Sequence, residues 1–175
     1  MNYIVKVILL VLMTGCVFPV KRTYFQPIET EGSKAHNGNH NGYFKTAKDE
    51  LQAKVEGVKI SIKPWLYKGK NIYLTIVFVY KTQLQDIEAK NLLLISNNIK
   101  YKPVSLEIED RKHRTFENRN NVGDERIRFV HLEYAVISDT LDKFEIKILD
   151  SMFNKLDFKF KKVTVSDMRF YTIND

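Results

Sequence analysis

Residues 72–80 read Ile-Tyr-Leu-Thr-Ile-Val-Phe-Val-Tyr, and this stretch decides the class of fold. Apolar side chains occupy every second position from Ile72 to Tyr80, which is the period of a β-strand. The positions between them include Tyr73, Val77 and Val79, so the other face of the strand is largely apolar too. A strand that is apolar on both faces belongs inside a sheet. We therefore expect residues 72–80 to form a central strand.

Shorter runs with the same period lie on both sides of this strand. The clearest alternations are at Val58, Ile60 and Ile62, and at Phe144, Ile146 and Ile148. The remaining apolar runs are residues 92–95, 99–104, 106–108, 127–137, 156–165 and 168–173. About seven or eight short strands with scarcely any helix predict an all-β fold, an antiparallel two-sheet β-sandwich of immunoglobulin-like architecture.

One of these runs changes phase partway along. Phe158 and Phe160 share one face with Leu156, whereas Val163 and Val165 fall on the opposite face. A single extra residue moves every later side chain to the other face of a strand. The change of phase therefore predicts a β-bulge at Lys161-Lys162.

The N-terminus has the parts of a secretory signal. An apolar run from Val7 to Met13 follows a single lysine, and Thr14 and Gly15 then precede Cys16, the only cysteine of the chain. The apolar run is shorter than the roughly 20 residues that a membrane-spanning helix needs. The segment is therefore expected to be a signal for export that is removed.

Residues 1–16 resemble the signal peptide and lipobox of bacterial lipoproteins, with Met13 standing where Leu, Val or Ile is usual. The resemblance implies cleavage before Cys16 and acylation of its thiol, which would anchor the chain in a membrane by palmitate or a similar lipid. Val17 follows the cysteine where Asp would retain a lipoprotein at the inner membrane, so the periplasmic face of the outer membrane is implied. An ordinary secretory signal and a cytosolic chain with an apolar start are the alternatives.

The expected organisation has three parts. Residues 1–15 form the signal peptide, 16–45 a lipidated flexible tether, and 46–175 a β-sandwich domain. The tether is predicted because proline and glycine are scattered through polar residues without an apolar period. Thr46 and Asp49 have the spacing of a capping box, which predicts a short helix over Thr46 to Ala53.

The segment 110–125 is the most distinctive part of the domain. The chain carries 28 Lys and Arg against 21 Asp and Glu, a formal net charge of +7, and this segment concentrates basic side chains without an apolar period. We expect a long loop here, and its arginines make it a candidate for binding an anionic partner, because arginine grips phosphate or carboxylate with a planar fork. The candidate binding residues are Arg111, Lys112, Arg114, Phe116 and Arg119. A solvated hairpin tip explains the same composition.

Other motifs give no positive indication of chemistry. Residues 37–42 follow the spacing of a calcium loop but supply only neutral amides. His36 and His40 are separated by Asn-Gly-Asn, which disfavours the helix that would bring both rings to one zinc ion. His131 is expected to be packed or solvent-facing. The sequence also lacks the nucleophile, zinc-protease and phosphate-loop motifs, so we predict no catalytic residues, no metal and no cofactor.

The sequence therefore favours a membrane-anchored, non-catalytic periplasmic lipoprotein that binds a protein or an envelope component. The alternative is a lipoprotein that binds an anionic ligand, or inhibits a toxin, through the loop 110–125. A small envelope hydrolase ranks last. Nucleic acid is a poor candidate partner because the signal peptide would remove the protein from it.

Overall fold

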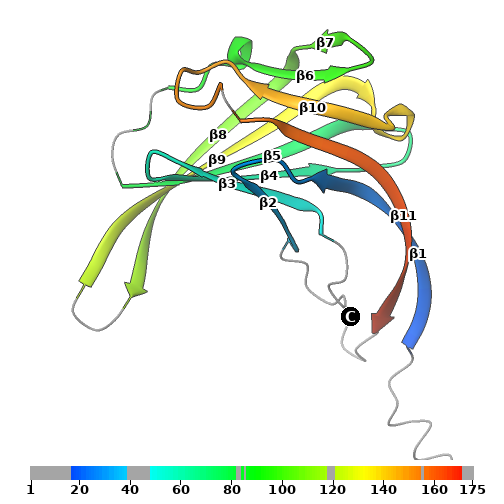
Figure 1. Cartoon of the computed structure of the whole chain (residues 1–175), viewed down its shortest axis with the longest axis horizontal. Helices are drawn as coiled ribbons and strands as arrows, with labels where there is room; N and C mark the ends of the chain where they lie inside the picture. Colours follow the sequence, from blue (N-terminus) through cyan, green and yellow to red (C-terminus); the bar gives the residue numbers. More distant parts are fainter. Residues whose placement is uncertain are drawn as a thin grey trace, which may run out of the picture.

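The computed structural model places two antiparallel β-sheets one above the other (Figure 1). We describe residues 17–38, 48–81, 84, 86–117, 121–154 and 156–170, with the backbone alone for 17–20, 113–117, 121–124 and 167–170. Within these ranges the regular elements are strands and two short 3₁₀ turns, without an α-helix. The same residues include no helix long and apolar enough to cross a membrane.

The elements follow one another in a simple order along the chain. The strands are β1 (Val17–Ile28), β2 (Ser33–His36), β3 (Glu50–Val55), β4 (Val58–Trp65), β5 (Asn71–Tyr80), β6 (Leu92–Ser96), β7 (Ile99–Tyr101), β8 (Pro103–Glu117), β9 (Asn121–Ile137), β10 (Lys143–Ile148) and β11 (Phe158–Phe170). The two 3₁₀ turns are Ala89–Asn91 and Ser138–Thr140. Sheet A has the strand order β1-β11-β10-β6-β7, and sheet B has the order β2-β3-β4-β5-β9-β8.

The prediction of a central strand at residues 72–80 is confirmed. Strand β5 lies between β4 and β9 in sheet B and pairs with both along most of its length. Its alternate side chains Ile72, Leu74, Ile76 and Phe78 are at most 1% exposed. These side chains form the inner face of sheet B, which is the face that packs toward sheet A.

The core lies between the two sheets and is rich in aromatic rings. Phe158 and Phe160 of β11 are both 0% exposed, as the phase of that run predicted. The Phe144 ring stacks on Phe160 with centroids 5.3 Å apart, and the Phe25 ring meets Phe144 edge-on at 4.9 Å. Strands β1, β10 and β11 therefore present one continuous aromatic surface to sheet B.

The prediction of a flexible tether over residues 16–45 is wrong for its described part. Strand β1 pairs with β11 from Val17↔Phe170 to Ile28↔Lys159, and β2 pairs with β3. Pro19 and Pro27 suggested a linker. However, β1 is an edge strand that pairs with β11 on one side only, and an edge strand tolerates proline because its other side has no ladder hydrogen bonds to lose. These strands raise the number above the seven or eight expected.

The predicted helix over Thr46 to Ala53 is also not formed. Residues 46 and 47 lie outside the described ranges, and Glu50–Val55 form β3, which pairs with β4. Leu51 and Ala53 are buried while Gln52 between them is half-buried. This period of two outweighs the local capping signal, because pairing on both sides of β3 satisfies its backbone groups.

The predicted bulge at Lys161-Lys162 is absent. The register between β1 and β11 runs without a shift, and Val163 and Val165 are half-buried on the face opposite Phe158 and Phe160. The two strands continue as a curved ribbon beyond the body of the sandwich (Figure 1). Since no sheet among the described residues faces this ribbon, its apolar side chains need not all lie on one face.

Candidate functional site

The outer face of sheet B, which points away from sheet A, carries an unusual set of side chains for a solvent-facing surface. Cross-strand pairing aligns Trp65 of β4 with Tyr73 of β5, and Thr75 of β5 with His131 of β9. Further along β5, Val77 pairs with Phe129. This face is therefore aromatic and apolar across three adjacent strands, although no other sheet in the described part of the chain covers it.

An open groove of about 500 Å³ lies on this face at the end of β4. We call it the aromatic groove, and define it by Trp65, Tyr67, Lys70, Tyr73, Thr75 and His131. The Trp65 and Tyr67 rings are nearly parallel, with 8° between their planes and centroids 6.5 Å apart. The Tyr73 ring meets Tyr67 edge-on at 6.0 Å. Tyr67 and Tyr73 are 45% and 37% exposed, so two of the three rings are open to a ligand.

Polar contacts hold the Trp65 ring in place. Its Nε1 donates a hydrogen bond to Thr75 Oγ1 at 3.1 Å, and the same hydroxyl lies 3.3 Å from His131 Nδ1. The Lys63 ammonium sits 4.4 Å from the centroid of the Trp65 ring, a favourable cation–π contact. The His131 ring stacks in turn on Phe129 with 7° between their planes. The indole is therefore a fixed wall of the groove.

Glu133 lies beside the aromatic groove and is itself held by hydrogen bonds. Asn71 Nδ2 donates to Glu133 Oε1 at 2.7 Å. A hydrogen bond to the same carboxylate raises the pKa of Tyr73 above its ordinary value of 10.0. The Tyr73 hydroxyl therefore remains a neutral donor at physiological pH.

A second open groove, of about 600 Å³, lies on the outer face nearer to β2. We call it the basic groove, and define it by Lys34, His36, Gln52, Lys54, Lys59 and Ser61. Lys34 pairs with Gln52 across β2 and β3, and Gln52 pairs with Ser61 of β4, so these side chains share one face. Lys34, Lys54 and Lys59 are exposed. The groove therefore presents three ammonium groups to solvent.

A buried charged junction lies at the margin of the same face. The Asp49 carboxylate, 5% exposed, is 3.3 Å from Arg22 Nη2 and 3.6 Å from Lys63 Nζ. The backbone N–H of Gly38 donates to Asp49 Oδ1 at 2.8 Å. Burial lowers the pKa of Lys63, and the attraction of Asp49 offsets part of that effect. The junction ties β1 of sheet A to β4 of sheet B.

A side chain at position 38 would meet the two charged groups of this junction. A Cβ atom there would lie 2.6 Å from Lys63 Nζ and 2.8 Å from Asp49 Oδ1. Both distances are below the closest approach of a carbon to a polar atom, so a larger residue would displace the two charged groups. The asparagine- and glycine-rich segment that suggested a linker therefore contributes at least one structural residue.

Residues 110–117 and 121–125, the described part of the segment 110–125, form strands rather than a loop. Strands β8 and β9 pair with each other up to Glu117↔Asn121, so the described backbone of the segment is two paired strands of a hairpin. The pair extends beyond the body of the molecule on the side opposite the β1–β11 ribbon (Figure 1). The alternation was obscured because charged residues occupy both faces of the ribbon where sheet A no longer covers it.

The hairpin also separates the predicted binding residues. Arg111 and Lys112 are successive strand residues, so their side chains point to opposite faces. Arg111 donates to both oxygens of Glu109, at 2.7 and 2.9 Å, and lies 4.9 Å from the centroid of the Phe129 ring. Its fork is therefore already occupied by a carboxylate of the chain.

The remaining predicted residues lie partly or wholly outside the described ranges. Arg114 and Phe116 are described only as paired backbone of β8, and Arg119 lies outside the described residues. Cys16 and His40 are outside them too. His36 is exposed on β2. Among the described residues, no group of three His, Cys, Asp or Glu side chains is placed to hold a metal ion.

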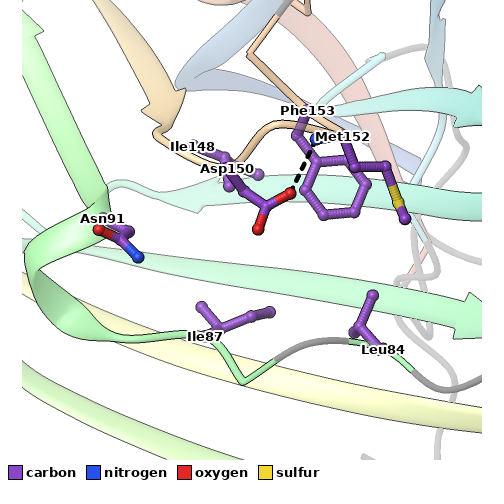
Figure 2. A pocket seen from close by; sticks show the side chains of 7 residues that line it. All are labelled: Leu84, Ile87, Asn91, Ile148, Asp150, Met152 and Phe153. Atoms are coloured by element: carbon purple, nitrogen blue, oxygen red, sulfur yellow. Dashed lines mark hydrogen bonds between the residues drawn. The ribbon is translucent and has the colours of Figure 1, made fainter.

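Figure 2 shows a further gap, between the connection that precedes β6 and the turn that follows β10. Leu84 and Ile87 line one side, and Met152 and Phe153 line the other. The gap measures about 20 Å³, room for roughly one water molecule. The Asp150 carboxylate accepts a hydrogen bond from the Met152 N–H at 2.9 Å, so it stabilises the turn. The gap is too small for a ligand.

No protein-family model, no curated protein and no solved structure matches this chain. The outer face of sheet B was not singled out from the sequence. Its aromatic residues are spread over β4, β5 and β9 and the connection between β4 and β5. A signal existed in the apolar outward positions of residues 72–80, since a solvated strand face is usually polar.

Proposed function

We propose that this chain is a lipid-anchored, non-catalytic binding protein of the bacterial cell envelope, with an immunoglobulin-like β-sandwich as its folded domain. Cys16 carries the lipid, and the periplasmic face of the outer membrane is the site of attachment. The outer face of sheet B binds a protein or another envelope component. The observation that carries the proposal is the aromatic groove, with two exposed tyrosine rings around a fixed indole on a face that no other described sheet covers.

Exposed aromatic rings support a binding role for two physical reasons. Tyr and Trp supply a large contact area with few rotatable bonds, so they lose little conformational entropy on binding, and they are enriched in binding hot spots. Ligand sites commonly have volumes of about 300–1,000 Å³ with a few polar groups among apolar ones. The aromatic groove, with Thr75, His131 and Lys70 around its rings, falls within that description.

The anchor is next to the first strand of the domain in this proposal. Strand β1 begins at Val17, the residue after the proposed lipidation site. The β1–β11 ribbon would therefore join the membrane to the sandwich, in place of the flexible spacer that the sequence suggested.

The runner-up is recognition of an anionic ligand or a toxin by residues 110–125. It has less support because Arg111 is already paired with Glu109 and because Lys112 projects from the other face of β8. A variant with Arg111, Lys112, Arg114 and Arg119 changed to Glu tests this alternative. If residues 110–125 bind the partner, this variant should no longer be crosslinked to it in cells. If the outer face of sheet B binds the partner, the variant should still be crosslinked to it.

The anchor is tested by Cys16→Ser. The variant should lose incorporation of labelled palmitate and move from the membrane to the soluble fraction. A cleaved Cys16→Ser chain that remained on membranes would contradict the lipid anchor.

The binding surface is tested by photo-crosslinking in intact cells. A photoreactive residue at Val77, in the middle of the outer face, should give a specific adduct, and the same residue at Lys100 of β7 in sheet A is the matched control. The adduct should disappear when Tyr67 and Tyr73 are both changed to Ala. Equal adducts at the two positions would contradict binding by the outer face.

A further inference from the structure

The two grooves on the outer face of sheet B lie along one strand. The outward side chains of β4 are Lys59, Ser61, Lys63 and Trp65. Lys59 and Ser61 line the basic groove, and Trp65 lines the aromatic groove. Trp65 is six positions after Lys59, which in a strand corresponds to about 20 Å. An extended ligand that follows β4 would therefore contact both grooves.

Charge is distributed unevenly over this face. Lys34, Lys54 and Lys59 are exposed on the β2–β4 side, and none of them forms an ion pair with another described residue. Two carboxylates, Glu107 and Glu109, lie on the β8 side of the same face, whereas the β2–β4 side has the three lysines against Glu50, whose Oε1 accepts a hydrogen bond from Gln52. The basic groove therefore favours a ligand with negative charge, and the β8 side disfavours one.

The aromatic groove adds a different requirement. The Tyr67 ring stacks on Trp65, and the exposed rings of Tyr67 and Tyr73 offer apolar surface to a ligand, while Lys70, Thr75 and His131 place polar atoms around it. A pyranose ring matches this arrangement, because its C–H groups form an apolar face and its hydroxyl groups form a polar rim. Aromatic rings provide this kind of contact at little entropic cost.

The backbone of the face argues against an added peptide strand. Strands β4 and β5 are paired on both sides, with β3 and β9 as their outer neighbours. Their N–H and C=O groups are therefore used within sheet B, whereas strand addition needs a free sheet edge. Side chains alone must recognise whatever lies along β4.

We propose that the outer face of sheet B binds an extended anionic glycan along β4. One sugar ring stacks in the aromatic groove, and acidic groups further along the chain contact Lys34, Lys54 and Lys59 in the basic groove. The inference rests on the proposed function and names the class of its ligand. It requires that affinity depend both on the aromatic rings and on the lysines.

Trp65 offers a direct readout because it is the only tryptophan of the chain. The detergent-solubilised full chain would be titrated with an oligogalacturonate as the anionic probe, and with a cello-oligosaccharide of equal length as the neutral control. We expect the anionic probe to shift the emission of Trp65, with an affinity that falls as salt is added. The neutral control should bind at least about tenfold more weakly.

Matched variants separate site binding from general attraction to a basic protein. Lys34→Gln, Lys54→Gln and Lys59→Gln together should weaken binding of the oligogalacturonate by at least about tenfold and flatten its salt dependence. The control removes the same charge from the sheet A side, through Lys100→Gln, Lys102→Gln and Lys143→Gln, and should keep the affinity. Tyr67→Ala and Tyr73→Ala should each weaken binding while leaving the unfolding midpoint nearly unchanged.

Three results would overturn the inference. The first is equal affinity for the neutral and anionic probes. The second is an equal loss of affinity in the two triple-lysine variants. The third is an affinity that Tyr67→Ala and Tyr73→Ala leave unchanged. If oligogalacturonate fails to bind while Val77 still crosslinks specifically to an envelope protein, the glycan inference fails and the proposed function survives. If the chain binds oligogalacturonate but the Cys16→Ser variant stays on membranes, the lipid anchor is contradicted and the glycan inference survives.

Discussion

The two faces of sheet B come from the same strands but have different surroundings. On the inner face, Ile76 and Phe78 of β5 are 0% exposed beneath sheet A. On the outer face, the intervening residues Tyr73 and Val77 are exposed or half-buried. Both faces are rich in apolar and aromatic side chains. The difference teaches that apolar side chains show which faces of a strand can be buried. The packing of one sheet on the other decides which of those faces is buried.

The contrast also separates stability from recognition. Inner-face side chains contribute to folding because they leave water in the native state. Outer-face side chains stay in contact with water in the free protein, so under the proposed function their burial would contribute to binding instead. The predictions below test this division, beginning with the largest expected effect.

Phe78→Ala should reduce the free energy of unfolding by about 4 kcal/mol, because it removes a fully buried ring and leaves a cavity. The Phe78 ring also contacts Phe153, with centroids 5.6 Å apart. Val77→Ala, at the adjacent residue on the outer face, is the matched control and should cost about 1 kcal/mol or less. Denaturant unfolding of both chains measures the difference. Equal losses would show that the outer face is covered as well.

Asp49→Asn should reduce the free energy of unfolding by about 3 kcal/mol. The substitution leaves Arg22 and Lys63 facing a neutral amide in a buried junction. Glu88→Gln removes an exposed carboxylate that pairs with Lys90 and should have little effect. The midpoint and slope of urea unfolding report both variants. A loss no larger than that of Glu88→Gln would mean that the junction does not hold the sheets together.

Tyr134→Phe should increase the free energy of unfolding by about 1 kcal/mol. The Tyr134 hydroxyl is buried on the inner face and has no hydrogen-bond partner among the described residues. Burial accordingly raises the pKa of Tyr134 above its ordinary value of 10.0. Removing an unpaired buried hydroxyl relieves its desolvation cost. Thermal unfolding would measure the gain, and a loss of stability would instead indicate a partner for the hydroxyl.

The smallest effect concerns the inner face of sheet B where the hairpin leaves the sandwich. There Arg128 donates to both carboxylate oxygens of Asp110, at 2.7 and 3.0 Å. Hydrogen bonding by Arg128 lowers the pKa of Asp110 below its ordinary value of 3.8. Because the pKa is lower in the folded state, the pair contributes stability above about pH 4, and this contribution is lost as the pH falls through the lowered value.

Asp110→Asn should therefore cost about 0.5 kcal/mol at neutral pH and nothing measurable in strong acid. Arg128→Gln should return the pKa of Asp110 toward 3.8, which carboxyl NMR titration can follow. An unchanged pKa in the Arg128→Gln chain would contradict the assigned cause.

Much of the fold could be predicted because its strands alternate clearly. The period of two in residues 72–80 and at Phe158 and Phe160 placed these side chains correctly in the core. Strand β1 escaped prediction because its pairing partner, β11, lies at the other end of the chain. Two prolines that would interrupt a central strand are tolerated at an edge. Local composition contains no information about which strand becomes an edge.

The candidate site could not be predicted in the same way. Trp65, Tyr73 and His131 come from three strands, and only the pairing of β4 with β5 and of β5 with β9 brings them together. The basic segment 110–125 attracted attention because its charges are contiguous in sequence. Strand alternation then directs neighbouring residues such as Arg111 and Lys112 to opposite faces. Contiguity in the chain was therefore a poor guide to a shared surface.

The sequence by itself determined an all-β chain, with a central strand at residues 72–80 and aromatic core positions such as Phe158. These features follow from side-chain period, which acts over neighbouring residues. Only the tertiary structure decided that residues 17–28 form an edge strand, that Asp49 joins Arg22 to Lys63, and that the aromatic and basic grooves share one face. These features depend on contacts between residues far apart in the chain, because the register of paired strands and the packing of one sheet on the other determine which side chains meet.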